Sequence, residues 1–329
     1  MSKVSIIIAN YNCSEFIGEA IHSVINQTFS NWELIVVDDC STDDSIDKIV
    51  QIQKQYDNIK LIKNETNEGP HLSRNKAIEV AGGDYIAVLD ADDLMMKNRL
   101  EKQVRYLDNH QEVDILHSGY ITFGRDKSIN LAITSNNEIH QKLFIGCPIC
   151  NSTVMWRSKL NLKYSEDLSR SEDYNMWVSA FDFTFAGISA PLVKRRSHDQ
   201  QISHIGTYTQ SLSDKVNKRL IRRYFTEINE EQIDLFEKGR AGRVDSIEEL
   251  QELDCLLVSM YEFSKRDLAL SKYEFGTEFF KMLINCCLRS DKKNIGFKPF
   301  STRITKLSGS QVKDRLMYVT KLLRNKLRR

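Results

Sequence analysis

Clustered aspartates at two places could bind a cation or a polar ligand. They are Asp38 and Asp39 in "VVDDCSTDDS" (36–45), and Asp90, Asp92 and Asp93 in "YIAVLDADDL" (85–94). Like charges repel, so each cluster needs a cation, a hydrogen-bonding ligand or solvent around it. Two carboxylates at i and i+2, where a strand ends, can share Mg²⁺ or Mn²⁺ and leave coordination positions for a diphosphate. Taken alone, the second cluster is equally compatible with an acidic helix cap formed by Asp93.

Three further stretches carry groups that could act on a ligand. In "NEGPHLSRNKA", Gly69 permits a tight turn, and Arg74 offers a fork of donors for a phosphate or carboxylate. "SRSEDYNMW" presents Glu172 and Asp173, which could supply a general base or simply open a helix. In "KRRSHDQQIS", His198 is either a metal ligand or a solvated surface residue.

The elements that would position these groups alternate regularly over the first ninety residues. The apolar runs predict buried strands at 4–8, 33–37, 59–62 and 85–89, with amphipathic helices between them. Ser14 is a candidate N-cap for the first helix. Apolar strands separated by helices indicate an α/β fold with a parallel sheet covered on both faces. Ligands of such sheets bind beyond the carboxyl ends of the strands, where both aspartate clusters lie.

The composition changes near residue 205. Between 95 and 205 the pattern is mixed, and beyond it long charged helical stretches follow. We therefore expect an α/β domain at 1–205 and a mostly helical C-terminal region at 206–329.

The bulk composition is that of an ordinary soluble protein. The 329 residues are 41% hydrophobic and 28% charged, and a net charge of +1 argues against a nucleic-acid partner. Seven scattered cysteines suit a reducing compartment, and "CPIC" (Cys147 and Cys150) predicts ordinary thiols rather than a zinc or redox site. No apolar run is long enough for a membrane span of about 20 residues, so we expect a cytoplasmic protein.

In their order and spacing, these motifs resemble those of family 2 glycosyltransferases, which are inverting enzymes of GT-A fold. The resemblance is carried by "SIIIANYN", "VVDDCSTDDS", "NEGPHLSRN", "GDYIAVLDADD" and "SEDYNMW", over residues 3–205. It implies a GT-A domain with a Rossmann-like, mostly parallel sheet. One departure is Ala9, where the family usually has proline, and this change puts no chemistry in doubt.

The resemblance also implies which residues bind the nucleotide. Tyr11 would lie on the base, Asp39 would accept a hydrogen bond from its edge, and Ala9 would give a backbone contact. Arg74 would help to hold the nucleotide, and Asp90 would face the ribose or the metal.

The remaining roles concern the cation and the reaction. Asp92 would coordinate Mn²⁺ or Mg²⁺ on the diphosphate, with His198 near the same cation. The cation would stabilise the charge that develops on the leaving nucleoside diphosphate. Asp173, preferred to its neighbour Glu172, would be the base that activates the incoming hydroxyl, and direct displacement would invert the anomeric carbon.

Three functions are compatible with this pattern. The first is transfer of a sugar from a nucleotide donor, by resemblance UDP-linked, to a carbohydrate or lipid-linked acceptor in cell-surface polysaccharide synthesis. The second is a catalytically inactive scaffold that binds nucleotide sugars, against which the presence of Asp90, Asp92 and Asp173 argues. The third, a nucleotidyltransferase, would require a glycine-rich loop after the first strand, and no glycine precedes Gly18.

The C-terminal tail is a separate feature. Between 311 and 329, seven Lys or Arg residues stand against one Asp, and apolar residues recur at three- and four-residue steps. This pattern predicts either a helix lying on the anionic inner face of the cell membrane or a terminal helix packed on the preceding helices.

Overall fold

The chain forms two compact units. A computed structural model describes residues 2–167, 171–198, 206–244 and 246–267, with Leu270, Phe279, Met282 and Cys286. The units comprise Met1–Ile139 with Gly146–Val216, and His140–Ile145 with Asn217–Arg329. The boundary expected at residue 205 coincides with the start of α7 (Gly206–Tyr224), whereas the units divide inside that helix. The tail at 311–329 lies outside the described residues.

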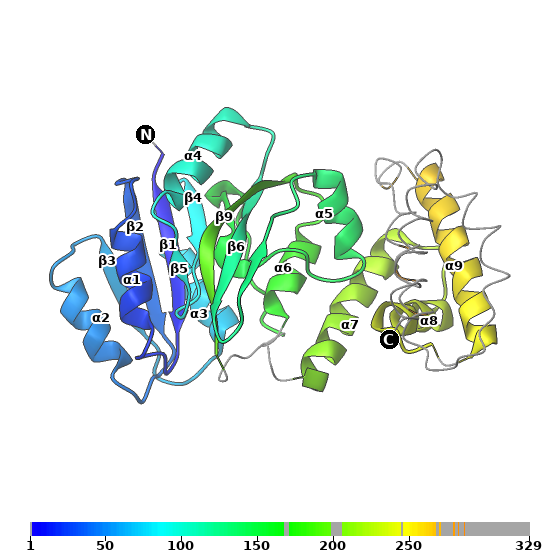
Figure 1. Cartoon of the computed structure of the whole chain (residues 1–329), viewed down its shortest axis with the longest axis horizontal. Coiled ribbons are helices and arrows are strands. Elements are labelled where there is room, and N and C mark those ends of the chain that lie inside the picture. Colours follow the sequence, from blue (N-terminus) through cyan, green and yellow to red (C-terminus); the bar gives the residue numbers. More distant parts are fainter. Residues whose placement is uncertain are drawn as a thin grey trace. The chain divides into compact units, whose positions relative to one another are not determined.

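The first unit is built on one sheet (Figure 1). Its strands run in the order β3-β2-β1-β4-β8-β6-β9-β5, with β7 beside β6. Their bounds are β1 (Val4–Asn10), β2 (Trp32–Asp38), β3 (Ile59–Lys63), β4 (Tyr85–Val88), β5 (Leu94–Met95), β6 (Ile115–Gly124), β7 (Ser128–Asn130), β8 (Met155–Arg157) and β9 (Phe185–Ser197). The first four strands pair in parallel, as the sequence predicts, so their carboxyl ends share one edge.

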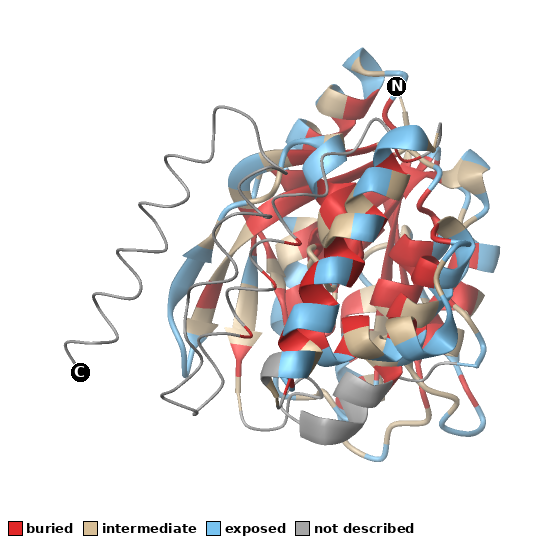
Figure 2. Cartoon of the chain, turned by 90° about the vertical axis from the view of Figure 1, so that its right-hand side faces the viewer, coloured by how far each residue is buried: buried red, intermediate tan, exposed pale blue. Residues whose placement is uncertain are grey.

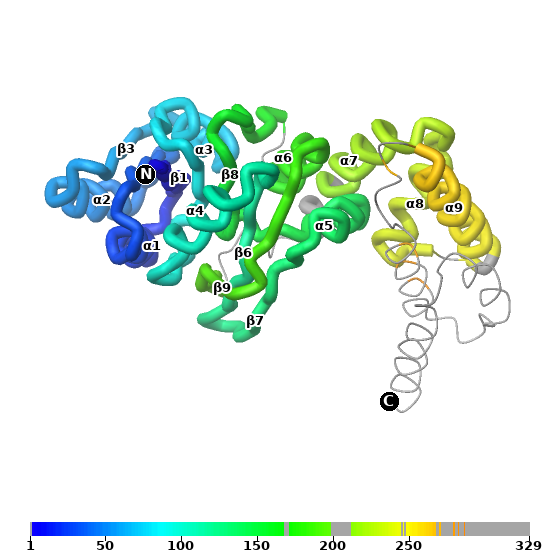
Figure 3. The backbone as a smooth tube through the Cα atoms, turned by 90° about the horizontal axis from the view of Figure 1, so that it is seen from above, coloured from blue at the N-terminus to red at the C-terminus, as the bar shows by residue number. Residues whose placement is uncertain are grey.

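Helices cover both faces of these strands. These helices are α1 (Ile17–Ile25), α2 (Ser45–Gln53), α3 (Pro70–Glu79) and α4 (Arg99–Asn109), and α5 (Asn136–Leu143) and α6 (Glu172–Ser179) follow along the chain. Alternate strand residues point to opposite faces, and Val4, Ile6 and Ile8 pack with apolar residues of α1, α2 and α4. Figure 3 shows α3 on the opposite side of the strands from α1 and α4. β1, β2 and β4 are accordingly buried along almost their whole length, whereas β3 at the edge of the sheet is mostly exposed or half-buried. Figure 2 colours the buried residues red.

One predicted cap is wrong. Ser14 does not cap α1, because the helix begins only at Ile17 and the Ser14 amide donates to Asp43 Oδ2 at 2.9 Å. The amides of Phe16 and Ile17 donate instead to Cys13 O, at 3.0 and 2.9 Å. A turn at residues 13–17 therefore connects β1 to α1, and the helix begins three residues after Ser14.

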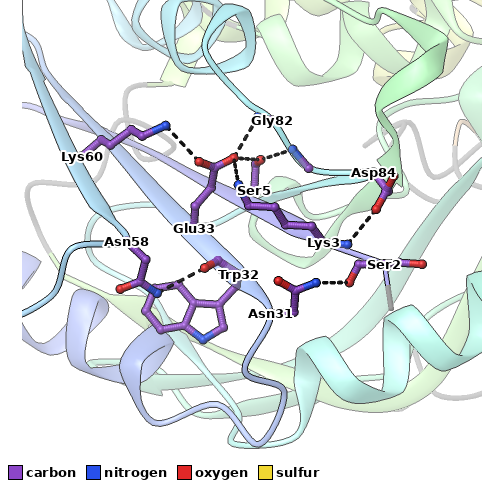
Figure 4. A network of polar contacts seen from close by, with 11 residues as sticks. Ser2, Lys3, Ser5, Asn31, Trp32, Glu33, Asn58, Lys60, Gly82 and Asp84 are labelled. Carbon is purple, nitrogen blue, oxygen red and sulfur yellow. Dashed lines mark hydrogen bonds and ion pairs between the residues drawn. The ribbon is translucent and has the colours of Figure 1, made fainter.

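A buried carboxylate holds the amino end of the sheet together (Figure 4). Glu33 accepts from Ser5 Oγ at 2.7 Å and from the Gly82 amide at 2.8 Å. Lys60 and Lys3 lie 3.0 and 3.1 Å from its oxygens. Burial opposes the charge of Glu33, but these partners lower its pKa to about 2. The network joins β1, β2, β3 and the turn before β4 at the end opposite the aspartate clusters.

The second unit is helical over its described residues. It contains the end of α7, together with α8 (Glu230–Ala241) and α9 (Ile247–Arg266). Asn229 and Gln232 form a reciprocal capping box at the start of α8. The Phe225 ring packs 5.4 Å from Phe144 and 5.8 Å from Phe263, between centroids. No helix in the described part of the chain is both long and apolar enough to cross a bilayer.

Candidate active site

The carboxyl ends of β1 and β2 are tied together by hydrogen bonds. Asn10 Nδ2 donates to Asp38 Oδ2 at 2.7 Å. Ser41 donates to the same carboxylate through its amide, at 2.9 Å, and through Oγ, at 2.7 Å. Asp38 is fully buried, so this aspartate of the first cluster anchors the turn after β2.

The predicted nucleotide contacts of β1 lie at this edge. Tyr11 is 50% exposed, so its ring is open to stack on a ligand. Ala9 lies two residues earlier and is partly exposed. The next residue after Tyr11, Asn12, has φ of 46°, and Cys40, two residues after the end of β2, has φ of 64°. Such left-handed conformations are costly for residues other than glycine, and they occur often at functional sites.

Asp39 holds the loop that leads into α3. It is 2% exposed and accepts from Asn64 Nδ2 at 2.7 Å and from the amides of Glu68 and Gly69, at 2.9 and 2.7 Å. Gly69, which directly precedes the helix, has φ of 92°, a conformation that suits glycine. A carboxylate has about four acceptor positions, so these three bonds leave one for a ligand donor.

Arg74 of α3 lies buried between two carboxylates. Nη2 donates to Asp90 Oδ1 at 2.8 Å, and Nη1 donates to Glu172 Oε1 at 2.9 Å. The guanidinium carbon lies 5.3 Å from the ring centroid of Tyr164. Burial opposes its charge, but the neighbouring carboxylates raise the pKa of Arg74 above its ordinary value. Arg74 therefore joins the end of β4 to the start of α6.

The second aspartate cluster divides into accessible and buried members. About a third of the Asp90 side chain and a fifth of the Asp92 side chain are exposed. Asp93 is 2% exposed and accepts from the Arg196 amide at 2.9 Å. Burial and the two neighbouring carboxylates raise the pKa of Asp93 well above its ordinary value. Asp93 is not a helix cap, because β5 follows it and α4 begins only at Arg99.

His198 lies beside Asp92, where the resemblance places it. Its Nε2 is 3.0 Å from Asp92 Oδ2, and its ring centroid is 5.0 Å from that of Phe16. Arg196 donates through Nε to Asp92 O at 2.9 Å and through Nη2 to Glu19 Oε2 at 2.6 Å. The end of β9 is thereby fastened to the segment after β4.

A divalent cation fits the pair formed by Asp92 and His198. Carboxylate oxygens suit Mg²⁺ and Mn²⁺, and imidazole is a common ligand of transition metals. Both side chains are about one-fifth exposed, and His198 Nε2 lies 3.0 Å from Asp92 Oδ2. In the described residues no three His, Cys, Asp or Glu side chains gather into a metal cluster. Mg²⁺ commonly takes one or two carboxylates and completes its shell with substrate phosphates and water, which two protein ligands would allow.

Glu172 and Asp173, the first two residues of α6, lie in different environments. Glu172 is bound to Arg74, and Asp173 Oδ1 accepts from the Tyr174 amide at 2.7 Å. Burial and the Glu172 carboxylate raise the pKa of Asp173 to about 7. A carboxyl group that titrates near neutral pH is well suited to accept a proton during a reaction. Ser171, which precedes the pair, has φ of 55° and turns the chain sharply into the helix.

Tyr164 is a site neighbour that the sequence analysis missed. Its hydroxyl donates to Asn151 Oδ1 at 3.0 Å, while its amide and carbonyl bond the Asn75 side chain at 2.8 and 2.9 Å. With its ring beside Arg74, Tyr164 supports the buried guanidinium. No local pattern could mark this role, because the Asn75 partner is 89 residues away in the sequence.

The prediction that the "CPIC" cysteines are ordinary thiols remains a prediction. Cys147 and Cys150 are both free. Burial raises the pKa of the Cys150 thiol, so little of it is the thiolate that metal binding or redox exchange requires.

Comparison with known proteins identifies the family. The family model described as "Glycosyl transferase family 2" matches residues 5–168. The glycosyltransferase TuaG of Bacillus subtilis (strain 168), assigned to teichuronic acid biosynthesis, is 43% identical over 210 residues, covering 61% of this chain and 81% of TuaG. The Escherichia coli enzyme WfgD, named UDP-Glc:alpha-D-GlcNAc-diphosphoundecaprenol beta-1,3-glucosyltransferase, is 33% identical over 177 residues, covering 54% of this chain and 68% of WfgD.

A solved structure confirms the fold. The crystal structure of S. aureus TarS 1-349 in complex with UDP-GlcNAc superposes with a TM-score of 0.59, covering 86% of this chain and 89% of that one. At 20% identity, the likeness concerns the fold alone. The expected GT-A fold with a C-terminal helical region is therefore confirmed, and the chain belongs to glycosyl transferase family 2 and is a glycosyltransferase.

Proposed function

We propose that this glycosyltransferase moves a sugar from a UDP-linked donor to a carbohydrate or lipid-linked acceptor, with a divalent cation and with inversion. The observation that carries the proposal is the Arg74 bridge, which holds Glu172 beside Asp90 and so brings Asp173 to the edge where Asp90 and Asp92 are accessible. The names of relatives support the substrate classes, since WfgD is named for a UDP-Glc donor and a diphosphoundecaprenol acceptor.

The nucleotide would bind across the ends of β1, β2 and β4. The half-exposed Tyr11 ring would stack on the base, and the remaining acceptor position of Asp39 would take a donor from its edge. The Ala9 backbone and the Asp90 carboxylate would border the ribose. Arg74 would support this pocket from beneath, through its bond to Asp90.

The diphosphate would lie toward Asp92 and His198, which would hold the divalent cation through a carboxylate oxygen and an imidazole nitrogen. When bound, Mn²⁺ or Mg²⁺ neutralises charge on the leaving nucleoside diphosphate. Arg196 keeps this part of the chain in place through the Asp92 carbonyl.

Asp173 would act on the acceptor. Its carboxylate would take the proton from an acceptor hydroxyl as that oxygen attacks the anomeric carbon, while the bond from this carbon to the diphosphate breaks. A single displacement of this kind inverts the anomeric configuration. The alternative, an inactive binding scaffold, would not need a carboxyl group at this position.

A donor screen tests the proposal. Purified protein with Mn²⁺ is given UDP-glucose, UDP-galactose, UDP-N-acetylglucosamine or GDP-mannose, and release of the nucleoside diphosphate is measured. We expect turnover of a UDP-linked sugar, lowered about a hundredfold or more by excess EDTA or by Asp92→Asn. Asp47→Asn, an exposed aspartate of α2, is the matched control and should leave the rate unchanged. Undiminished turnover in EDTA would contradict cation dependence, and no turnover of any donor would favour the scaffold.

A further inference from the structure

The buried guanidinium of Arg74 connects two parts of the site that are far apart in the sequence. It is 7% exposed and bonds Asp90, 16 residues away, and Glu172, 98 residues away. Its Nε is buried and makes no hydrogen bond to any described residue, so the two carboxylates and the Tyr164 ring set its orientation. The stability that a buried ion pair contributes depends on its geometry. Removing one partner leaves a buried charge without a counter-charge.

The bond from Arg74 to Glu172 gives Glu172 and Asp173 different environments. Only 15% of the Glu172 side chain is exposed, and Oε1 is committed to Arg74. Asp173, the next residue, carries the raised pKa. Two adjacent carboxylates without the arginine would repel each other, and either could take the proton or turn toward the cation.

Arg74 itself is held rigidly. The Asn75 side chain accepts from the Tyr164 amide and donates to the Tyr164 carbonyl, and the Tyr164 hydroxyl donates to Asn151. The ring therefore stays against the guanidinium, and the guanidinium has little freedom to swing toward a ligand. Its position couples α3, the end of β4 and the start of α6.

We propose that Arg74 is a positioning residue for the reaction, acting through Glu172 and Asp90 rather than by contact with the nucleotide, and that Glu172 positions the base helix rather than serving as the base. The inference rests on the proposed function of this site. Its consequence is that Arg74 and Glu172 contribute to turnover as one unit.

A double-mutant cycle tests this coupling. Wild type, Arg74→Gln, Glu172→Gln and the double variant are compared for kcat and KM on the nucleotide sugar that the donor screen finds, and for affinity for UDP with Mn²⁺. We expect Arg74→Gln to lower kcat by about thirtyfold and to change KM and UDP affinity by less than about threefold. The double variant should turn over about tenfold faster than Arg74→Gln, because the unpaired carboxylate is gone.

The matched control is a pair between α3 and the residue before Tyr164. Lys163 Nζ lies 2.8 Å from Glu79 Oε1, and about half of each side chain is exposed. Lys163→Gln and Glu79→Gln should leave kcat within about twofold of wild type, because exposed pairs contribute little. Arg74→Lys keeps the charge but not the two-armed fork, so it should recover only part of the lost kcat.

Several outcomes would overturn the inference. Additive effects in the cycle would mean that Arg74 and Glu172 act separately. A loss of UDP affinity in Arg74→Gln larger than the loss of kcat would make Arg74 a nucleotide ligand. If Arg74→Gln does not fold, the inference would be overturned by a kcat that is unchanged in both Arg74→Lys and Glu172→Gln. A wild type that hydrolyses no donor would instead overturn the proposed function, and the inference with it.

Discussion

Asp173 is the residue whose ionisation should set the pH dependence of turnover. A base must be deprotonated to accept a proton, and burial beside Glu172 raises the pKa of Asp173 to about 7. We therefore expect kcat to rise about tenfold per pH unit below this value and to level off above it. A pH profile of kcat, with cation and donor saturating at every point, measures this. A profile that is already flat at pH 5 would assign the base to a group of ordinary carboxylate pKa.

For single residues, the sequence named candidates for the site but not the residues that they bond. The family resemblance named Asp92 and His198 for one cation site, and the structure brings their side chains within 3.0 Å of each other. Asp39 was predicted to bind the nucleotide and to help turn the chain into the next helix, and it accepts three bonds from the loop before α3. The bridge from Arg74 to Glu172 joins residues 98 positions apart. Such pairings depend on how the strands assemble, and a single sequence carries no local signal of them.

The amino end of the sheet should depend on Glu33. Replacing the buried carboxylate by Glu33→Gln leaves Lys3 and Lys60 without their counter-charge, so the free energy of unfolding should fall by about 1–3 kcal/mol. Urea denaturation measures the change. Glu101→Gln, which breaks the exposed pair with Arg105 on α4, is the control and should cost less than about 0.5 kcal/mol.

The same carboxylate predicts a sensitivity to acid. The pKa of Glu33 is lowered from 4.5 to about 2 on folding. Its contribution to stability is therefore complete above pH 4.5 and is lost as the pH falls toward 2. The stability difference between wild type and Glu33→Gln should shrink over this interval, and a difference that stays constant would show that the charge of Glu33 is not what stabilises the network.

Elements with strong local patterns were predicted well. β1, β2 and β4 were found because each is a short run of buried, mostly apolar residues, and β3 was found from its apolar residues although most of it is not buried. The two residues of β5, Leu94–Met95, pair with β9 about a hundred positions later and were not foreseen. Such a short strand has no periodicity of its own, and its existence depends on where the rest of the sheet places it.

For the molecule as a whole, the basic tail remains a prediction from the sequence. Residues 311–329 carry seven Lys or Arg and one Asp, and each cation near an anionic leaflet is worth about 1 kcal/mol. Deleting this segment should release the protein from vesicles of anionic lipid at low salt without changing donor hydrolysis. Co-sedimentation measures the binding, and vesicles of neutral lipid are the control. Equal binding with and without the tail would leave only the packed-helix interpretation.

The central claim is that the site performs base-assisted sugar transfer, and Asp173→Asn tests it most directly. The variant keeps the size of the side chain but cannot accept the proton, while the proposed nucleotide contacts are untouched. Turnover of the donor and affinity for UDP with Mn²⁺ are measured side by side. We predict that turnover falls at least about a hundredfold, with UDP affinity within about twofold of wild type. Turnover equal to that of the wild-type protein would contradict the account.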